Sequence, residues 1–190
     1  MSSKRRATRT SSAKLALALA LIGLSLLPAA ADDRLDDLLS ALQVMPLGDQ
    51  RPAPFMLDAL DGKPVSLADL RGRAALLYFW DSTCPYCARE LPSTIEQVNR
   101  ELKDQGLVVL AINLGEKRDL VAGWVKSRAV TSTVLLDAKG EVSKQYDIAY
   151  TPTVFLVDRG GRLVGKAIGE RQWTGEQGRA LLRSLLARKS

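Results

Sequence analysis

The chain of 190 residues contains no histidine and only two cysteines, Cys84 and Cys87. A structural zinc site needs four ligands, usually Cys or His, so zinc is excluded by the ligand count. Covalent haem attachment needs a histidine directly after the second cysteine, and that residue is Ala88. We therefore expect no metal and no haem site.

Aromatic residues are also scarce, at 5% of the chain, and no basic stripe with interleaved aromatics occurs. The formal net charge of +6 comes largely from the first 31 residues, which hold five of the 27 basic residues and no acid. The remaining chain has 22 basic and 21 acidic residues, a net charge of +1. We therefore expect no nucleic-acid partner.

Residues 1–31 have the pattern of a secretory signal peptide. A basic head is followed by the 13-residue apolar run Leu15 to Leu27 and by the small residues Ala29 to Ala31. The run is short for a membrane span, which needs about 20 residues. We expect export and cleavage after Ala31. Retention of the segment as a membrane anchor is the alternative.

Two parts are expected after the signal: a short helix and linker over residues 32–47, and one domain over residues 48–190. Four leucines between Leu35 and Leu42 recur at helical spacing, which predicts a helix over residues 34–45. That helix is expected to pack on the domain, with a partner-docking arm as the alternative. Three prolines and a glycine in Met45 to Pro54 indicate a linker.

Strand-like and helix-like segments alternate along the domain, which predicts an α/β fold with a central mixed sheet flanked by helices. Ala74 to Trp80 is continuously apolar, as expected of a strand covered on both faces. Asp61-Gly62 indicates a hairpin. Further strands are expected at Leu107–Leu114, Thr133–Leu136, Thr153–Asp158 and Arg162–Ile168, and helices over residues 85–103, 117–128, 140–147 and around Leu181–Leu186.

The cysteine pair is interpreted as a redox centre. A plain structural disulfide across so small a loop would stabilise the fold by only about 2 kcal/mol. Cys84 follows a buried strand at the start of a helix, and Pro85 suits the first helical turn. Free N–H groups there favour a thiolate. Cys84 would attack a substrate disulfide, and Cys87, one turn further on, would resolve the mixed disulfide.

Glu90 lies three residues after Cys87 and projects from the same helix face. It can act as the base that removes the Cys87 proton, or it can be an ordinary surface carboxylate. Spacing alone leaves both interpretations open.

Residues 48–190 resemble the TlpA/ResA-like branch of the thioredoxin superfamily, which comprises extracytoplasmic thiol–disulfide oxidoreductases of bacteria. The matching pieces occur in family order over nearly all of the domain. They are Pro52-Ala53-Pro54-Phe55, Asp61-Gly62-Lys63, Leu67 to Gly72, Phe79-Trp80, Cys84 to Cys87 with Glu90 and Pro92, Tyr146, Tyr150-Thr151-Pro152-Thr153, Phe155 to Asp158, Gly160 and Gly169.

The resemblance implies a thioredoxin fold with an N-terminal β-hairpin extension. It also implies that Pro152 is cis and faces the cysteine pair, that the Thr151 backbone is open to an extended substrate segment, and that Glu90 is an active-site group. The other expected substrate-binding residues are Trp80, Pro85 and Tyr86. No cofactor is expected beyond the redox-active Cys84–Cys87 disulfide.

Two positions depart from the pattern. Family members usually have Trp directly before the first cysteine, where this chain has Thr83, and this changes the surface around Cys84. Thioredoxins have a buried acid six residues before that cysteine, where this chain has Tyr78. The second departure leaves Glu90 as the nearest candidate base.

The leading hypothesis is a periplasmic dithiol reductant of selected protein disulfides, in apocytochrome c or metalloprotein maturation, supplied by a membrane electron donor. Anchoring to the inner membrane is expected only if the signal is retained. The alternatives are a disulfide-forming oxidase or isomerase and a non-enzymatic interaction module. A peroxidase is disfavoured because Asp81 occupies the position where an activating Thr or Ser is needed.

Overall fold

The computed structural model describes residues 29–188, with side-chain surroundings from Arg34 onward. From Leu35 onward the described chain forms one compact unit. The predicted signal segment lies outside the described residues, apart from Ala29–Ala31 at the start of the first helix. No helix within residues 29–188 is both long enough and apolar enough to cross a membrane.

The sheet is mixed and eight-stranded, in the order β1-β8-β7-β4-β5-β6-β2-β3. β4, β5 and β6 run parallel to one another, and every other neighbouring pair is antiparallel. The predicted mixed sheet and the Asp61-Gly62 hairpin are both confirmed. The strands are β1 (Met45–Gln50), β2 (Met56–Ala59), β3 (Pro64–Ser66), β4 (Ala74–Trp80), β5 (Leu107–Leu114), β6 (Thr133–Asp137), β7 (Thr153–Val157) and β8 (Leu163–Ile168).

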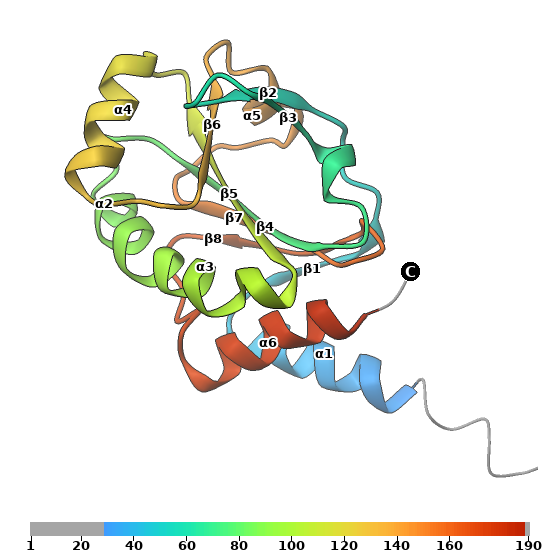
Figure 1. The fold of residues 1–190 in the computed structure, drawn as a ribbon. Helices are drawn as coiled ribbons and strands as arrows, with labels where there is room; N and C mark the ends of the chain where they lie inside the picture. The colour runs from blue at the N-terminus through green and yellow to red at the C-terminus, as the bar shows by residue number, and fades with distance from the viewer. Residues whose placement is uncertain (1–28, 189–190) are drawn as a thin grey trace, which may run out of the picture. The chain divides into compact units, whose positions relative to one another are not determined.

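Helices cover both faces of the sheet (Figure 1). One apolar cluster joins the sheet to α1, α3, α4 and α6, and the other joins it to α5 and to the segment before β4. The helices are α1 (Ala29–Ala41), α2 (Pro85–Glu90), α3 (Glu96–Leu102), α4 (Arg118–Ser127), α5 (Glu141–Gln145) and α6 (Glu176–Ala187), with short turns η1 (Leu67–Leu70), η2 (Leu91–Ile95) and η3 (Lys103–Gln105).

Strand β4 carries the site and is buried along its whole length. Leu76 and Tyr78 pack into the first apolar cluster, whereas Leu77 and Phe79 pack into the second. Successive side chains of a strand point to opposite faces, so an unbroken apolar run suits a strand that is covered on both sides. The sequence-based interpretation of this strand is confirmed.

The linker predicted over Met45–Pro54 is wrong for its first half, because Met45–Gln50 form the edge strand β1, which pairs with β8. An edge strand tolerates a residue such as Pro46 that cannot donate a ladder hydrogen bond. The helix predicted before it is present as α1, which ends at Ala41. Leu35 and Leu39 are buried in the first cluster, which favours packing on the domain over a docking arm.

The helix predicted over residues 85–103 is divided by a wide turn. α2 leads into η2, a stretch of π-helix that contains Pro92, before α3 begins. Proline lacks the N–H of a regular helix and clashes with the carbonyl four residues earlier, and a wider turn relieves both problems. The turn also keeps Leu91 and Ile95 buried.

Gly178 in α6 is expected to be intolerant of alanine. A Cβ there would overlap the backbone carbonyl oxygens of Gln172 and Trp173. Overpacking of this kind costs roughly 1–3 kcal/mol. We expect Gly178→Ala to lower the free energy of unfolding by about that amount, measured by urea denaturation.

The matched control is Gly123→Ala in α4, where no heavy atom outside the helix's own backbone lies within 4 Å of the added Cβ. Alanine is the better helix former, so this change should raise the free energy of unfolding by up to about 1 kcal/mol. Effects of the same sign at both glycines would contradict the packing described for α6.

Candidate active site

The two cysteines lie where the central strand gives way to a helix. β4 ends at Trp80, the loop Asp81–Thr83 follows, and Cys84 is the N-cap residue of α2. The backbone N–H of Cys87 donates a hydrogen bond of 3.1 Å to the Cys84 Sγ. Pro85 occupies the first helical turn, where its missing N–H leaves no bond unmade. The local geometry agrees with the sequence-based expectation for this pair.

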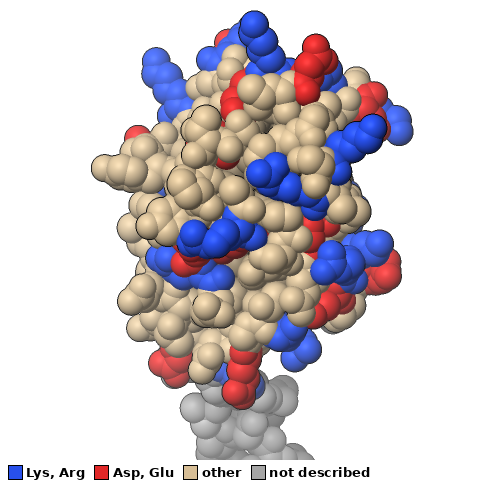
Figure 2. Space-filling model, turned by 90° about the vertical axis from the view of Figure 1, so that its left-hand side faces the viewer, with Lys and Arg blue, Asp and Glu red and all other residues tan. Residues whose placement is uncertain are grey.

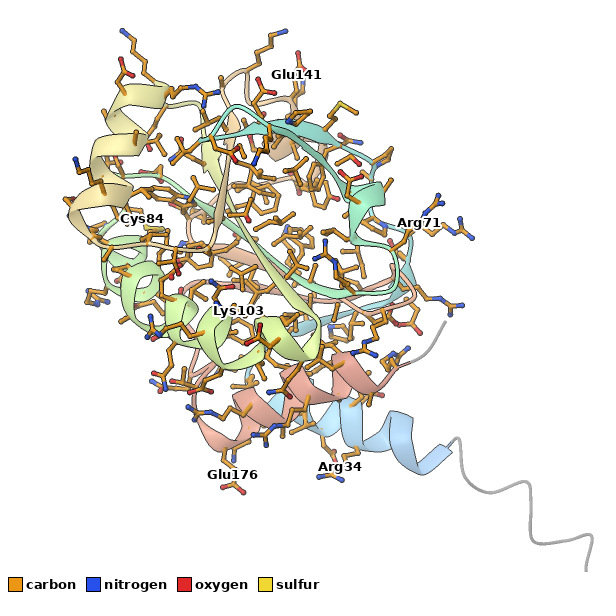
Figure 3. All side chains as sticks on the ribbon, in the orientation of Figure 1. Arg34, Arg71, Cys84, Lys103, Glu141 and Glu176 are labelled. Atoms are coloured by element: carbon orange, nitrogen blue, oxygen red, sulfur yellow. A yellow bond between two sulfur atoms is a disulfide. The ribbon has the colours of Figure 1, made fainter. Side chains whose placement is uncertain are left out.

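Cys84 and Cys87 form a disulfide, with their Cα atoms 5.3 Å apart. Cys84 keeps 7% of its surface exposed, whereas Cys87 is completely buried. Figure 3 shows Cys84 at the left-hand edge of the molecule. Of the two sulfurs, only that of Cys84 is accessible to a second protein.

The loop before β7 lies directly against Cys84. The Thr151–Pro152 peptide bond is cis, as the resemblance implied, and the Thr151 carbonyl oxygen lies 3.4 Å from the Cys84 Sγ. In the reduced form the Cys84 thiol can donate a hydrogen bond to this oxygen. Pro152 is buried, and its own carbonyl accepts a hydrogen bond of 2.7 Å from Gly169 N–H.

The Asp81 carboxylate joins the loop before Cys84 to the Thr151 loop. It accepts hydrogen bonds from the Thr83 N–H (3.0 Å) and hydroxyl (2.5 Å), and from the Thr151 hydroxyl (2.7 Å). Partial burial raises the pKa of Asp81, but the hydrogen bonds from Thr83, Thr151 and the Cys84 N–H outweigh it, so the pKa lies below its ordinary value. Asp81 is therefore ionised at neutral pH next to Cys84.

A second carboxylate, Glu116, holds the same loop from the end of β5. It accepts hydrogen bonds from the Ser82 N–H (2.8 Å), from the Ser82 hydroxyl and from the Asn113 amide (2.6 Å). Within the described residues neither Asp81 nor Glu116 forms a salt bridge with Lys or Arg. The loop before Cys84 is thus held by two carboxylates that have no paired cation, its own Asp81 and Glu116 from the end of β5.

Glu90 is a buried carboxyl at the end of α2, with only 2% of its surface exposed. Its oxygens accept hydrogen bonds from the Tyr78 hydroxyl (3.1 Å) and from the Arg171 N–H (3.0 Å). It lies one helical turn beyond Cys87 on the same helix. The alternative of an ordinary surface carboxylate is therefore wrong.

The protonation of Glu90 is set mainly by burial, which raises its pKa to about 7. The hydrogen bonds from Arg171 and Tyr78 lower the pKa, the negative charge of Glu170 raises it, and the Trp173 indole lowers it slightly, although the indole N–H makes no hydrogen bond of ordinary geometry. A pKa near neutrality lets Glu90 both accept and release a proton. Burial and the Glu90 charge raise the pKa of Tyr78, which stays protonated as a donor.

The surface around Cys84 carries exposed aromatic side chains. Tyr86, in the first turn of α2, is 54% exposed, and Tyr150, in the loop before β7, is 70% exposed. The Arg89 guanidinium lies 5.0 Å from the centre of the Tyr86 ring and pairs with Glu170 at 2.5 Å. Figure 2 views the molecule from this side, where uncharged side chains predominate. Such a surface suits another protein.

One expected substrate-binding residue is corrected. Trp80 is completely buried in β4 and contacts the Trp124 ring, with their centroids 4.5 Å apart, so it cannot touch a substrate. Because side chains alternate between the two faces along β4, the Trp80 side chain points into the core beneath the loop Asp81–Thr83. Pro85 and Tyr86 are exposed, and Thr151 is partly exposed, so these three remain accessible.

Sequence reasoning missed the structural roles of Asp81 and Glu116. The pattern Asp81-Ser82-Thr83 carried a local signal, because an Asp side chain often accepts a hydrogen bond from the N–H two residues on. Glu116 lies 34 residues from Ser82 and had no local signal. Within residues 29–188 no group of three or more potential ligand side chains could hold a metal ion.

Comparison with known proteins agrees with this geometry. The AhpC/TSA family model matches residues 47–166, and the chain belongs to that family. ResA, a thiol–disulfide oxidoreductase of Bacillus subtilis, is 35% identical over 60% of this chain and 64% of its own length. ResA of Bacillus cereus is 31% identical over 67% of this chain and 72% of its own length.

A solved structure supports the same assignment. A putative thiol:disulfide interchange protein DsbE of Chlorobium tepidum has a TM-score of 0.67 and 28% identity, and the match covers 73% of this chain and 96% of that one. The protein is therefore an oxidoreductase of the ResA/DsbE type with a thioredoxin-like fold. The matched segment spans 64% of Bacillus subtilis ResA, somewhat less than two thirds of its length.

Proposed function

We propose that this protein is an extracytoplasmic dithiol reductant of protein disulfides. The Cys84 thiolate attacks one sulfur of a substrate disulfide, forms a mixed disulfide and releases the first substrate thiolate. Cys87 then loses its proton and attacks the Cys84 sulfur, which releases the second substrate thiolate and forms the Cys84–Cys87 disulfide. Two electrons pass from the cysteine pair to the substrate. No cofactor is needed beyond the pair.

The direction of electron flow is argued from two carboxylates near Cys84: Asp81 in the loop before Cys84, and Glu116, which follows β5 and accepts hydrogen bonds from Ser82 of that loop. The Cys87 N–H favours a Cys84 thiolate, but two negative charges without paired cations oppose it. Strong oxidants such as DsbA owe their high potential to a stabilised reduced form. A less stabilised thiolate keeps the potential low, which favours a reductant over the oxidase or isomerase alternative.

Glu90 serves the resolving step in this proposal. Cys87 is buried and must lose a proton before it can attack, and Glu90 one turn further on has a pKa of about 7. It can take the proton when the mixed disulfide resolves and return it when the pair is reduced again. Its hydrogen bonds to Tyr78 and Arg171 fix the position of its carboxyl oxygens.

An extended segment of the substrate would bind between Tyr86 and Tyr150, beside the Thr151 backbone. The two rings offer apolar surface, and the Thr151 carbonyl already lies against Cys84. Backbone pairing of this kind accepts many sequences around the disulfide. Pro85 adds a small exposed surface at the start of α2.

The location and the partners follow from the export pattern of residues 1–31 and from the family resemblance. A periplasmic reductant needs a membrane electron donor, because that compartment is kept oxidising. Apocytochrome c and metalloproteins under maturation are the proposed substrates. The protein would be anchored to the inner membrane if residues 1–31 are retained.

The cellular redox state of the pair tests this proposal. Cells are quenched in acid, free thiols are alkylated, and the protein is separated by the number of labelled cysteines. We expect Cys84 and Cys87 to be mainly in the dithiol form when the donor pathway is intact. A pair that is mainly disulfide would favour the oxidase alternative.

Removal of one carboxylate should make the pair less reducing. Asp81→Asn keeps the size of the side chain but removes its charge, so the Cys84 thiolate is stabilised. We expect the pKa of the Cys84 thiol to fall by about half to one unit. At a pH above that pKa, a fall of one unit in the pKa makes the reduction potential of the cysteine pair about 30 mV less negative. Thiol alkylation rates against pH and equilibrium with dithiothreitol at pH 9 provide the two measurements.

The charge-matched control is Asp104→Asn, on the exposed η3 turn away from Cys84. It should leave both the alkylation profile and the potential unchanged. Glu116→Gln should shift both in the same direction as Asp81→Asn. No shift in either active-site variant would remove the electrostatic argument for a reductant.

A further inference from the structure

A second feature lies at the opposite end of β4 from the cysteines. A pocket of about 600 Å³ opens where three segments meet: the chain after β1, the turn before β4 and the hairpin turn between β7 and β8. Arg73 directly precedes β4 and Cys84 follows its other end, and a seven-residue strand spans roughly 20 Å. Figure 3 shows Arg71 and Cys84 on opposite sides of the molecule.

The lining of this pocket is strongly basic. Its lining residues contain no Asp or Glu but include five arginines from three segments: Arg51, Arg71, Arg73, Arg159 and Arg162. Composition does not explain this, because residues 32–190 together have a net charge of only +1. The five arginines are a local concentration of positive charge.

Nearby acids do not neutralise the pocket. Asp49 and Asp158 are each within salt-bridge distance of Arg188, at 2.6 and 3.1 Å. Asp69 accepts a hydrogen bond of 2.8 Å from the Ser66 N–H, which is the main cause that lowers its pKa, and the positive charge of Arg73 lowers it further. Asp69 therefore offsets part of the Arg73 charge from outside the lining, whereas Asp49 and Asp158 face Arg188.

Most of the guanidinium donors are available to a ligand. Within the described residues, no side-chain hydrogen bond or salt bridge engages Arg51, Arg71 or Arg162. Arg73 donates only to the Asp69 carbonyl at 3.3 Å. Arg159 donates one bond of 2.9 Å to the Gln105 carbonyl, while its Nε is buried without a partner.

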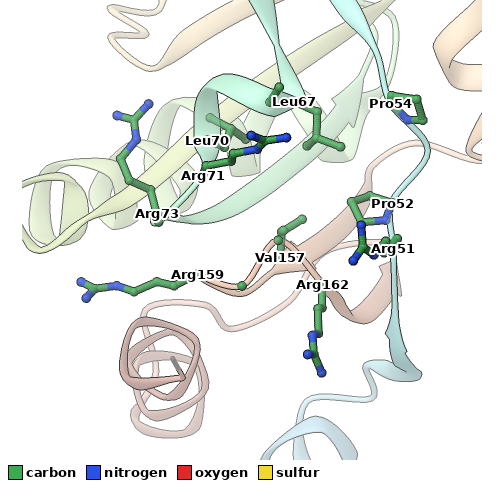
Figure 4. A pocket seen from close by; sticks show the side chains of 14 residues that line it. Arg51, Pro52, Pro54, Leu67, Leu70, Arg71, Arg73, Val157, Arg159 and Arg162 are labelled. Atoms are coloured by element: carbon green, nitrogen blue, oxygen red, sulfur yellow. The ribbon is translucent and has the colours of Figure 1, made fainter. Parts of the chain in front are cut away.

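The arginines surround an apolar floor. Figure 4 shows Arg71 on one side of the hollow and Arg51 with Pro52 on the other, and Val157 lies between them. The uncharged part of the lining also includes Pro54, Leu67, Ala68, Leu70 and three glycines, Gly72, Gly160 and Gly161. Arg73 and Arg159 extend toward a third side, and Arg162 points away from the hollow. A fitting ligand has an anionic group for the rim and an uncharged part for the floor.

We propose that this pocket binds a phosphate-bearing ligand, either an acidic phospholipid headgroup or a soluble phosphate compound. Guanidinium groups bind phosphate oxygens in pairs of parallel hydrogen bonds, and several can share one tetrahedral anion. The volume suits a small molecule rather than a lone ion. A lipid bound here would hold the protein on a membrane with Cys84 at the far end, open to its substrates.

The test compares the full-length protein with Arg51→Gln/Arg71→Gln. Pyrophosphate binding is measured by calorimetry, and vesicle binding is measured by co-sedimentation with phosphatidylglycerol or phosphatidylcholine. The double variant should bind pyrophosphate or phosphatidylglycerol vesicles at least tenfold more weakly. The vesicle signal is the difference between the wild type and each double variant on the same lipid, because the five basic residues and the apolar run of residues 1–31 are common to all of them. Arg100→Gln/Lys139→Gln removes two exposed charges elsewhere and should bind as the wild type does.

Binding to phosphatidylglycerol alone identifies the lipid source, and binding to pyrophosphate alone identifies a soluble source. The proposal is overturned if the wild type binds neither, if the two double variants behave alike, or if only an acidic peptide such as polyglutamate binds. Thermal unfolding checks that each variant is folded. Both substituted arginines of the pocket are exposed, so their loss should leave the unfolding midpoint unchanged.

Discussion

A Cys87→Ser variant is expected to accumulate as mixed disulfides with its substrates. Cys84 is the only accessible sulfur of the pair, so it still captures a substrate, but the buried thiol that would release it is gone. Turnover should fall by at least roughly a thousandfold, as when a covalent catalyst loses an essential group. Non-reducing electrophoresis followed by mass spectrometry measures the adducts and identifies the substrates.

Cys84→Ser is the matched control, because it also leaves one cysteine. Cys87 has no exposed surface, so this variant should form no adducts and should lose function in cells. Full cellular function of Cys84→Ser would support the non-enzymatic interaction module. Equal trapping by the two variants would contradict the assignment of Cys84 as the attacking sulfur.

Glu90→Gln should slow the resolution of the mixed disulfide by about 100-fold, the lower end of what a positioned base contributes. In the wild type the rate should rise with pH and level off above about 7, where Glu90 is ionised. The variant has no such base, so its rate should keep rising toward alkaline pH as Cys87 ionises by itself. Stopped-flow measurement of thiol release from a preformed adduct at Cys84 gives both profiles.

Glu141→Gln, an exposed carboxylate on α5, is the control and should leave the profile unchanged. An unchanged profile in Glu90→Gln would remove Glu90 from the mechanism.

The pH dependence of the free energy of unfolding gives a second test of the raised Glu90 pKa. Because the folded-state pKa of Glu90 lies above its ordinary value of 4.5, its contribution to stability is present below about pH 4.5 and is lost as pH rises through about 7. In Glu90→Gln this loss of stability with rising pH should be absent.

The central part of the fold could be predicted because its signals are local. The continuous apolar run of β4 indicates burial on both faces, and the Asp61-Gly62 turn predicts the β2–β3 hairpin. Strand β1 could not be predicted in the same way. Its residues Pro46 and Gly48 are typical of turns, and only the partner strand β8, far along the chain, makes it a strand.

The candidate site, too, could be predicted from the sequence only in part. The spacing of Cys84, Cys87 and Glu90 along one helix follows from the sequence, and the resemblance supplied the cis bond before Pro152. Trp80 was expected at the substrate surface because it ends β4 next to the cysteine loop, although the apolar run of β4 indicates burial, and its packing against Trp124 of α4 depends on the tertiary fold. Contacts between loops, such as Asp81 with Thr151, depend on the tertiary fold and have no signature in spacing.

The redox equilibrium of Cys84 and Cys87 tests the account most directly. The purified protein is equilibrated with mixtures of reduced and oxidised dithiothreitol, and the fraction of disulfide is measured by thiol labelling. We expect one two-electron transition with a midpoint closer to the roughly −270 mV of thioredoxin than to the roughly −120 mV of DsbA. A pair that does not interconvert, or a midpoint near −120 mV, would contradict the proposed reductant.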